Sequence, residues 1–149
     1  MGEKMNKYTF EGYQDMPDAM TFEEMSTAYH GLIDGVGQCD SECEELFDAL
    51  LNAAFTYTDM RMRWMRFSLE QKASQDNIRT QMHNACIAAV TIIARYMHHQ
   101  KKDIKWAEIV CGLSQEDILS GNMAYMNLHR KRIGDFMNYI GFVHAVNAR

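Results

Sequence analysis

The sequence predicts an all-α protein: a helical bundle of three long helices and two or three short ones. Apolar residues recur at alternating steps of three and four through long stretches without proline, which is the pattern of helices that bury one face. The chain has 149 residues, of which 47% are hydrophobic and 23% charged, as expected for a folded domain with its own core. We therefore expect residues 1–149 to form a single helical domain.

Three apolar seams define the long helices. The first is made by Leu46, Leu50, Ala53, Tyr57, Met60, Trp64 and Phe67. The second is made by Ile78, Met82, Ala85, Ala89, Ile92 and Tyr96. The third is made by Met126, His129, Ile133, Phe136, Ile140 and Val143. A mean spacing near 3.5 residues predicts left-handed packing at small crossing angles.

The N-terminal part of the chain predicts an arm and then a helix. Residues 1–20 have no sustained period and contain glycines and the single proline, which favours a turn-rich arm. Thr21 and Glu24 have the spacing of a capping box, which predicts a first helix that ends near Gly35.

Capping residues also place the long helices. Ser41 and Glu44 form a second capping-box pattern, which predicts a helix over about 40–72. Ser74 is the expected cap of the next helix, about 75–99, and the short link makes the pair an antiparallel hairpin.

The rest of the chain predicts short helices and then one long one. A helix near 103–111 should end at Gly112, and Ser114 should begin another turn or two. Gly121 should separate that turn from the last long helix, about 122–146.

Charge is distributed unevenly along the chain. Residues 1–50 carry 12 acidic and 2 basic side chains, whereas residues 51–149 carry 8 acidic and 13 basic ones. The two parts should attract each other, or the basic part should bind an anion.

The sequence favours a cytoplasmic protein. No apolar run suggests a membrane span or a signal peptide, and the four cysteines include no Cys-x-x-Cys pair. We therefore expect reduced thiols and no membrane partner.

A polar stripe suggests a ligand site at the tip of the hairpin. It contains Asn52, Thr56, Asp59, Arg63 and Arg66 on the first helix of the hairpin, and Arg79, His83 and Asn84 on the second. The stripe is either a solvated face with local ion pairs or a cationic cleft in which arginines bind phosphate or carboxylate groups. Whether its members converge depends on how the helices are rotated.

A second stripe, of small residues, suggests a homodimer. Gly134, Asn138, Gly141 and Ala145 follow the same helical spacing on the last helix. Small side chains allow another backbone to approach closely. The partner is either another helix of this chain or the same helix of a second copy, and we favour the dimer.

Motifs for other functions are weak. Residues 103–132 resemble a degenerate helix-turn-helix, with its turn glycine one place late and acidic residues where DNA would lie, so DNA binding is an alternative. Glu42 and Glu45 give one of the two carboxylate pairs that a metal-dependent nucleotide phosphohydrolase needs, which makes this enzyme a second alternative. The cysteines lack the spacing of a zinc site and no other catalytic motif is present, so we expect a non-enzymatic protein without a cofactor.

Two segments, His83 to Met97 and Arg130 to Phe136, resemble small helical proteins of Gram-positive bacteria and their phages. That resemblance implies no activity, because those proteins have none assigned. It singles out Arg79, His83, Asn84, Arg95, Arg132 and Asp135.

We therefore expect a small regulatory or interaction protein that binds an anionic partner or small ligand at the hairpin tip. Arg132 and Asp135 would supply a second wall of the site. The expected ligand-binding residues are Arg63, Arg66, Arg79, His83, Asn84, Arg132 and Asp135.

Overall fold

The computed structural model describes residues 19–147, and within this range it contains seven α-helices and no strand. The helices are α2 (Phe22–Gly37), α3 (Ser41–Trp64), α4 (Leu69–His99), α5 (Lys105–Cys111), α6 (Gln115–Leu119), α7 (Met123–Asn127) and α8 (Arg130–Asn147). The predicted all-α class is confirmed. All but the last two residues of the predicted N-terminal arm lie outside the described range.

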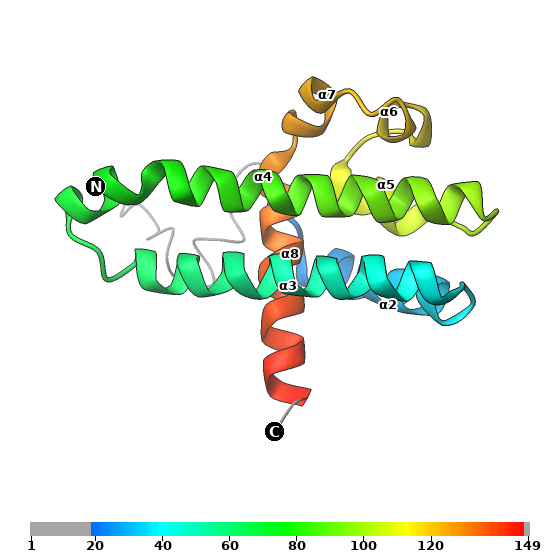
Figure 1. Ribbon diagram of the computed structural model, residues 1–149, viewed down its shortest axis with the longest axis horizontal. Coiled ribbons are helices and arrows are strands. Elements are labelled where there is room, and N and C mark those ends of the chain that lie inside the picture. The colour runs from blue at the N-terminus through cyan, green and yellow to red at the C-terminus, as the bar shows by residue number, and fades with distance from the viewer. Residues whose placement is uncertain (1–18, 148–149) are drawn as a thin grey trace, which may run out of the picture.

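α3 and α4 form the antiparallel hairpin, but the break between them comes earlier than the sequence predicted (Figure 1). The N-cap of α4 is Ser68, whose hydroxyl accepts from the Gln71 N–H while the Gln71 side chain accepts from the Ser68 N–H. This capping box satisfies two amides that the helix itself leaves unpaired. Ser74, the predicted cap, lies inside α4 and donates to the Gln71 carbonyl.

Other caps follow the sequence more closely. Thr21 and Glu24 form the predicted capping box at the start of α2. Gly112 and Gly121 have positive φ angles of 64° and 71°, as the predicted helix ends require. The cap of α3 is Asp40 and not Ser41, and its carboxylate also accepts a hydrogen bond from Tyr96 near the end of α4. This bond ties the open ends of the hairpin together.

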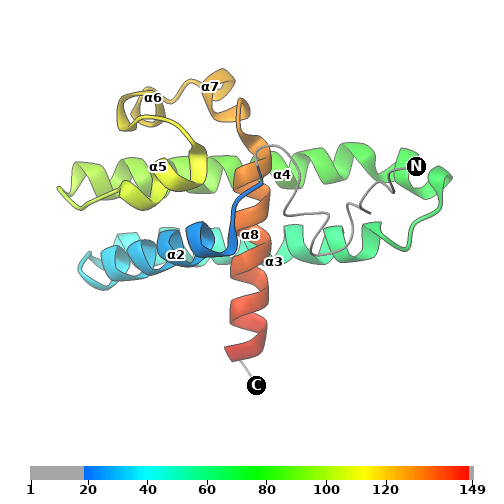
Figure 2. The same ribbon diagram turned by 180° about the vertical axis from the view of Figure 1, so that it is seen from behind.

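The last long helix differs most from the prediction. It is divided into α7 and α8, and α8 crosses the hairpin steeply instead of lying side by side with it (Figures 1 and 2). An added Cβ would lie 2.9 Å from the Tyr57 hydroxyl at Gly134 and 2.5 Å from Thr58 Oγ1 at Gly141. The two glycines therefore let α8 cross directly against α3.

This crossing gives the small-residue stripe a partner within the chain. Thr58 Oγ1 donates to the Asn138 side-chain oxygen at 3.2 Å, and Gly134 and Gly141 are buried against α3. The face that the sequence assigned to a dimer is thus covered by the chain's own helix, for Gly134, Asn138 and Gly141. The side chain of Ala145 is outside the described part of the structure.

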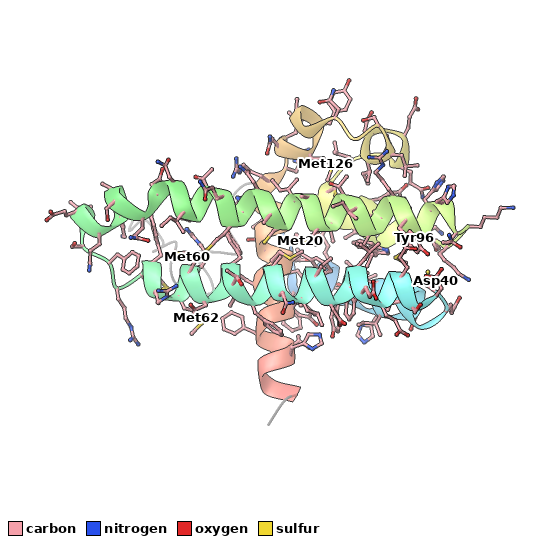
Figure 3. All side chains as sticks on the ribbon, viewed as in Figure 1. Met20, Asp40, Met60, Met62, Tyr96 and Met126 are labelled. Atoms are coloured by element: carbon pink, nitrogen blue, oxygen red, sulfur yellow. The ribbon has the colours of Figure 1, made fainter. Side chains whose placement is uncertain are left out.

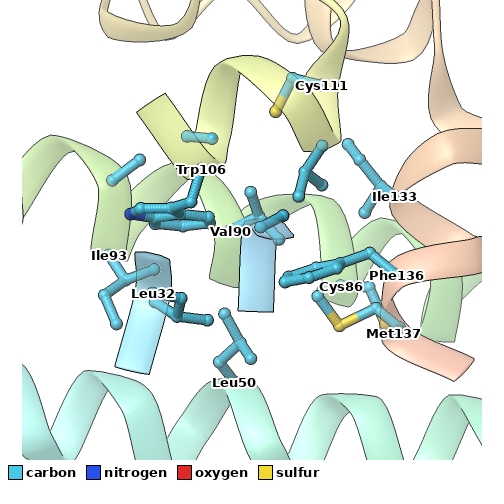
Figure 4. Close-up of a cluster of buried hydrophobic side chains, with 14 of the residues drawn as sticks. Leu32, Leu50, Cys86, Val90, Ile93, Trp106, Cys111, Ile133, Phe136 and Met137 are labelled. Atoms are coloured by element: carbon cyan, nitrogen blue, oxygen red, sulfur yellow. The ribbon is translucent and has the colours of Figure 1, made fainter. Parts of the chain in front are cut away.

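The core lies where the hairpin, α8 and the two helices behind the hairpin meet. Figure 4 shows Leu32, Leu50, Val90, Trp106 and Phe136 together, one each from α2, α3, α4, α5 and α8. The apolar seam predicted for α4 is wrong, because the helix is rotated about its axis and buries a neighbouring face. Ile78 and Ile92 are 41% and 52% exposed, and the buried face of α4 contains His83, Cys86, Ile87, Val90, Thr91, Ile93, Ala94 and Met97.

No helix in residues 19–147 combines the length and apolar character that crossing a bilayer requires.

Candidate anion-binding site at the helical hairpin

The predicted ligand-binding residues fall into two groups in the structure. Arg79, His83 and Asn84 lie on α4, with Arg63 near the end of α3 and Arg66 in the turn that follows. Arg132 and Asp135 lie on α8, on the face turned away from Gly134. The candidate site therefore lies on the hairpin where α8 crosses it. Its second wall is formed by Arg130 of α8, and not by Arg132 and Asp135.

His83 is the centre of the site. It is 6% exposed, and its ring stacks on Tyr57 with centroids 5.1 Å apart. Its Nε2 lies 2.8 Å from the carbonyl oxygen of Arg130, and its Nδ1 lies 2.9 Å from Nη2 of the same residue. Because Nδ1 faces a guanidinium donor, it must accept, so the ring is neutral and its proton lies on Nε2.

The electrostatics agree with a neutral ring. The pKa of His83 is lowered to about 4, first by burial and then by the positive charges of Arg130, Arg79 and Arg61, while the hydrogen bond to the Arg130 carbonyl opposes this shift. Burial raises the pKa of the Tyr57 hydroxyl, while the same three arginines oppose that shift. Three guanidinium groups from α3, α4 and α8 thus act on one pair of buried rings.

Arg79 is the best-placed cation of the three. Its Nη2 lies 2.7 Å from Asp76, and its guanidinium lies 5.0 Å from the centroid of the Trp64 ring. Its Nε is buried and has no hydrogen-bond partner among the described residues. A buried N–H without an acceptor costs about 1–3 kcal/mol, which a bound acceptor would recover.

Arg130 and Arg61 complete the cluster, and sequence reasoning did not assign either to it. The guanidinium of Arg130 contacts the neutral imidazole of His83, and no described carboxylate forms an ion pair with it. Arg61 is half-buried one helical turn after Tyr57, which was the only hint of its place that the sequence offered. Nothing local could have indicated Arg130, because it meets His83 across 47 residues of chain.

The remaining hairpin residues are more peripheral. Arg63 forms an ion pair of 3.0 Å with Asp59 on its own helix, and both side chains are more than half exposed. Arg66 and Asn84 are exposed. The strongest charge effects on His83 and Tyr57 come from Arg61, Arg79 and Arg130, and not from Arg63 or Arg66.

Arg132 and Asp135 instead attach α8 to the rest of the molecule. The Nη2 of Arg132 donates to Glu24 at 2.9 Å and to the Ile109 carbonyl at 2.8 Å. Asp135 is 2% exposed, accepts from the Met20 N–H at 3.0 Å, and forms an ion pair with Lys131 at 3.4 Å. Burial raises the pKa of Asp135 to about 7, although the bond from Met20 opposes this shift.

The segment considered for DNA binding, residues 103–132, forms α5, α6, α7 and the start of α8, and a turn at Gly112 joins α5 to α6. α6 has only five residues, and its first turn contains Glu116 and Asp117. Arg132, one of the cations that would meet phosphates, is already bound to Glu24. These features give DNA binding no support beyond the sequence pattern.

The carboxylates considered for a phosphohydrolase, Glu42 and Glu45, are exposed on the first turns of α3. Residues 19–147 contain no group of three or more His, Cys, Asp and Glu side chains placed to hold a metal ion. The second alternative therefore gains no support from the geometry.

A shallow groove of about 290 Å³ lies between α2 and α5, away from the hairpin tip. Its charged residues are Asp34 and Asp103 against Lys102 and Lys105, so opposite charges balance. Trp106 lines the groove, and its indole nitrogen is buried without a hydrogen-bond partner in the described residues. The groove concentrates no charge of one sign, unlike the hairpin cluster.

Comparison with known proteins adds no further assignment: no protein-family model, curated protein or solved structure matches the chain.

Proposed function

We propose that the protein is a small, non-enzymatic regulatory or interaction protein that binds an anionic ligand at the α3–α4 hairpin. The ligand carries a phosphate or carboxylate group and contacts the guanidinium groups of Arg61, Arg79 and Arg130. The observation that carries the proposal is the contact of the Arg130 guanidinium with the buried His83 ring, which stacks on Tyr57. Arg79 lies one helical turn before His83 on α4, and Arg61 lies one turn after Tyr57 on α3.

The composition of the cluster favours an anion over other ligands. A guanidinium that has no carboxylate partner retains its charge and its donors for a phosphate or carboxylate, which it binds with two parallel hydrogen bonds. Arg130 is held in place by a neutral histidine, and Arg79 has a buried Nε without an acceptor. Both features are typical of a site prepared for an acceptor-rich ligand.

The free thiols of the chain suit the cytoplasmic location that we expect. Cys39, Cys43, Cys86 and Cys111 are all unpaired. Burial raises the pKa of Cys43, Cys86 and Cys111 to about 12, so these three thiols stay protonated and unreactive in a reducing compartment.

Tryptophan fluorescence gives a direct test. The chain has two tryptophans, and Trp106 is 2% exposed in the core, so Trp64 under Arg79 reports on the site. Titration with inorganic pyrophosphate at low ionic strength should change the Trp64 emission in a saturable way. A Trp64→Phe variant should lose the response but keep the stabilisation by pyrophosphate in thermal unfolding.

Matched variants distinguish a site from general charge attraction. Arg79→Gln and Arg61→Gln should each weaken pyrophosphate binding about tenfold or more, since a hydrogen bond to a charged group contributes about 1.5–3 kcal/mol. Arg95→Gln removes an exposed arginine from the far part of α4 and should leave the affinity unchanged. Equal loss in all three variants, or none in Arg79→Gln, would reject the site.

A further inference from the structure

Apolar side chains of α3 continue from its buried face onto its exposed surface. Phe47 and Leu51 are partly buried against the core, and Phe55 and Met62 extend the same side of the helix toward solvent. Phe55 is 41% and Met62 is 55% exposed. Figure 3 shows Met60 between α3 and α4 and Met62 on the opposite side of α3. The apolar surface of α3 is therefore wider than the part that the described chain covers.

The C-terminal half of α8 borders the same face. Figures 1 and 2 show its last turns extending past α3 without another helix beside them. The ring of His144 meets Phe55 and Phe47 at centroid distances of 6.0 and 6.5 Å, and its Nε2 lies 2.8 Å from the Tyr29 hydroxyl. Phe142 on this projecting part is 52% exposed. The projecting helix and the apolar side of α3 form an apolar corner.

The charges that flank the corner are arranged for pairing with a copy of itself. Glu44 and Asp48 are exposed in the N-terminal turns of α3, and Arg66 is exposed in the turn that follows its C-terminal end. Phe55 is midway in sequence between Glu44 and Arg66. From Phe136 to Asn147, α8 contains no Asp, Glu, Lys or Arg, although the whole chain has a net charge of −5.

We propose that two copies of this chain pair through this corner about a two-fold axis that passes α3 near Phe55. The two α3 helices then run antiparallel, so that Glu44 of each copy faces Arg66 of the other. The two projecting ends of α8 run antiparallel beside each other, and each fills the corner of the other copy. Such reciprocity is what an isologous dimer interface requires.

The two-fold arrangement explains why the projecting end of α8 is uncharged. A helix end that remained in water would gain solubility from charged side chains, and the aromatic rings beside it would leave a large apolar patch exposed. A second copy covers both the helix end and the rings, and uncharged surfaces of the same chain do not repel each other. This interface lies on a different face of α8 from Gly134 and Gly141, which α3 covers.

The oligomeric state of the full chain tests the proposal. Sedimentation velocity between about 1 and 100 µM should show a dimer of the wild-type protein. Phe55→Glu should be monomeric over the same range with unchanged helical content by circular dichroism. Leu69→Glu, which places the same charge on a side chain 85% exposed at the hairpin tip, should remain dimeric.

Charge reversal tests the antiparallel register without touching the apolar contacts. Glu44→Arg alone and Arg66→Glu alone should each raise the dimer dissociation constant about tenfold. The two changes in one chain restore both opposite-charge pairs, so the double variant should return close to the wild-type constant. A monomeric wild-type protein at 100 µM, a Phe55→Glu dimer of unchanged affinity, or no recovery in the double variant would overturn the proposal.

Discussion

The Nδ1 atom of His83 accepts hydrogen bonds from the guanidinium of Arg130, so a buried base is held against a permanent cation instead of a carboxylate. The Nε2 atom of the same ring meets the backbone carbonyl of Arg130 at 2.8 Å. A protonated ring would place a proton between Nδ1 and the guanidinium. The contact between α4 and α8 therefore requires neutral histidine.

The first prediction concerns acid stability. The pKa of His83 is lowered from 6.5 to about 4 by folding, so the unfolded state binds the proton more readily between these values. The stabilisation from neutral His83 is complete above about pH 6.5 and is lost as the pH falls toward 4, by about 3 kcal/mol in total. Urea unfolding of His83→Gln should show a deficit at pH 7 that narrows by this amount near pH 4. A constant deficit would mean that the ring is not held neutral.

Asp135 makes the opposite prediction. Burial raises its pKa from 3.8 to about 7, so the folded state holds the proton more tightly, and its stability falls as the pH rises from about 4 to 7. Asp135→Asn keeps an oxygen for the Met20 N–H but cannot ionise. We expect this variant to match the wild type near pH 4 and to exceed it above pH 7 by at most on the order of 3 kcal/mol, because it also loses the ion pair with Lys131.

The two groups can be separated by measuring both variants over the same pH range. In wild-type protein the contributions of His83 and Asp135 to the pH dependence have opposite signs between about pH 4 and 6.5, so they partly cancel. Removing one reveals the slope of the other. If Asp135→Asn is less stable than wild type at pH 8, its carboxylate is stabilised in the folded state and the shift has the other direction.

The all-α class could be predicted because the spacing of apolar residues along a helix is a local property of the sequence. It failed at the break of the hairpin because two capping patterns competed, and the complete box of Ser68 and Gln71 formed where Ser74 was expected. It also failed for the rotation of α4. Ile78 and Ile92 fit a helical seam, but the face that is buried depends on where α8 crosses, and no local pattern contains that information.

The candidate site was likewise predictable only where its residues are neighbours in the sequence. Arg79 and His83 are one turn apart on α4, so their shared face was evident from the sequence. Arg61 and Arg130 join them only because α3 and α8 meet α4 in the fold. Arg132 and Asp135 were expected at the site, yet they bind Glu24 and Met20, which lie 108 and 115 residues away in sequence. Contacts at such separations follow from tertiary structure alone.

A third prediction tests the close crossing of α8 over α3. An added Cβ at Gly141 would lie 2.5 Å from Thr58 Oγ1, so Gly141→Ala should destabilise the fold by about 1–3 kcal/mol despite the better helix propensity of alanine. Gly37→Ala is the control, because nothing lies within 4 Å of its added Cβ. Denaturant unfolding should show a loss for the first variant and no loss for the second. Equal stabilities would place α8 farther from α3.

The last prediction tests where α4 begins. Ser68→Ala removes the hydroxyl that accepts from the Gln71 N–H at 3.1 Å, and it should lower the free energy of unfolding by about 1 kcal/mol. Ser74→Ala should be neutral or slightly stabilising, because this hydroxyl only donates to the Gln71 carbonyl within the helix, and alanine is the better helix former. Chemical denaturation of the two variants shows which of the two serines caps the start of α4. A loss at Ser74 with none at Ser68 would mean that α4 begins at the later position, with Arg79 in its second turn instead of about three turns inside the helix.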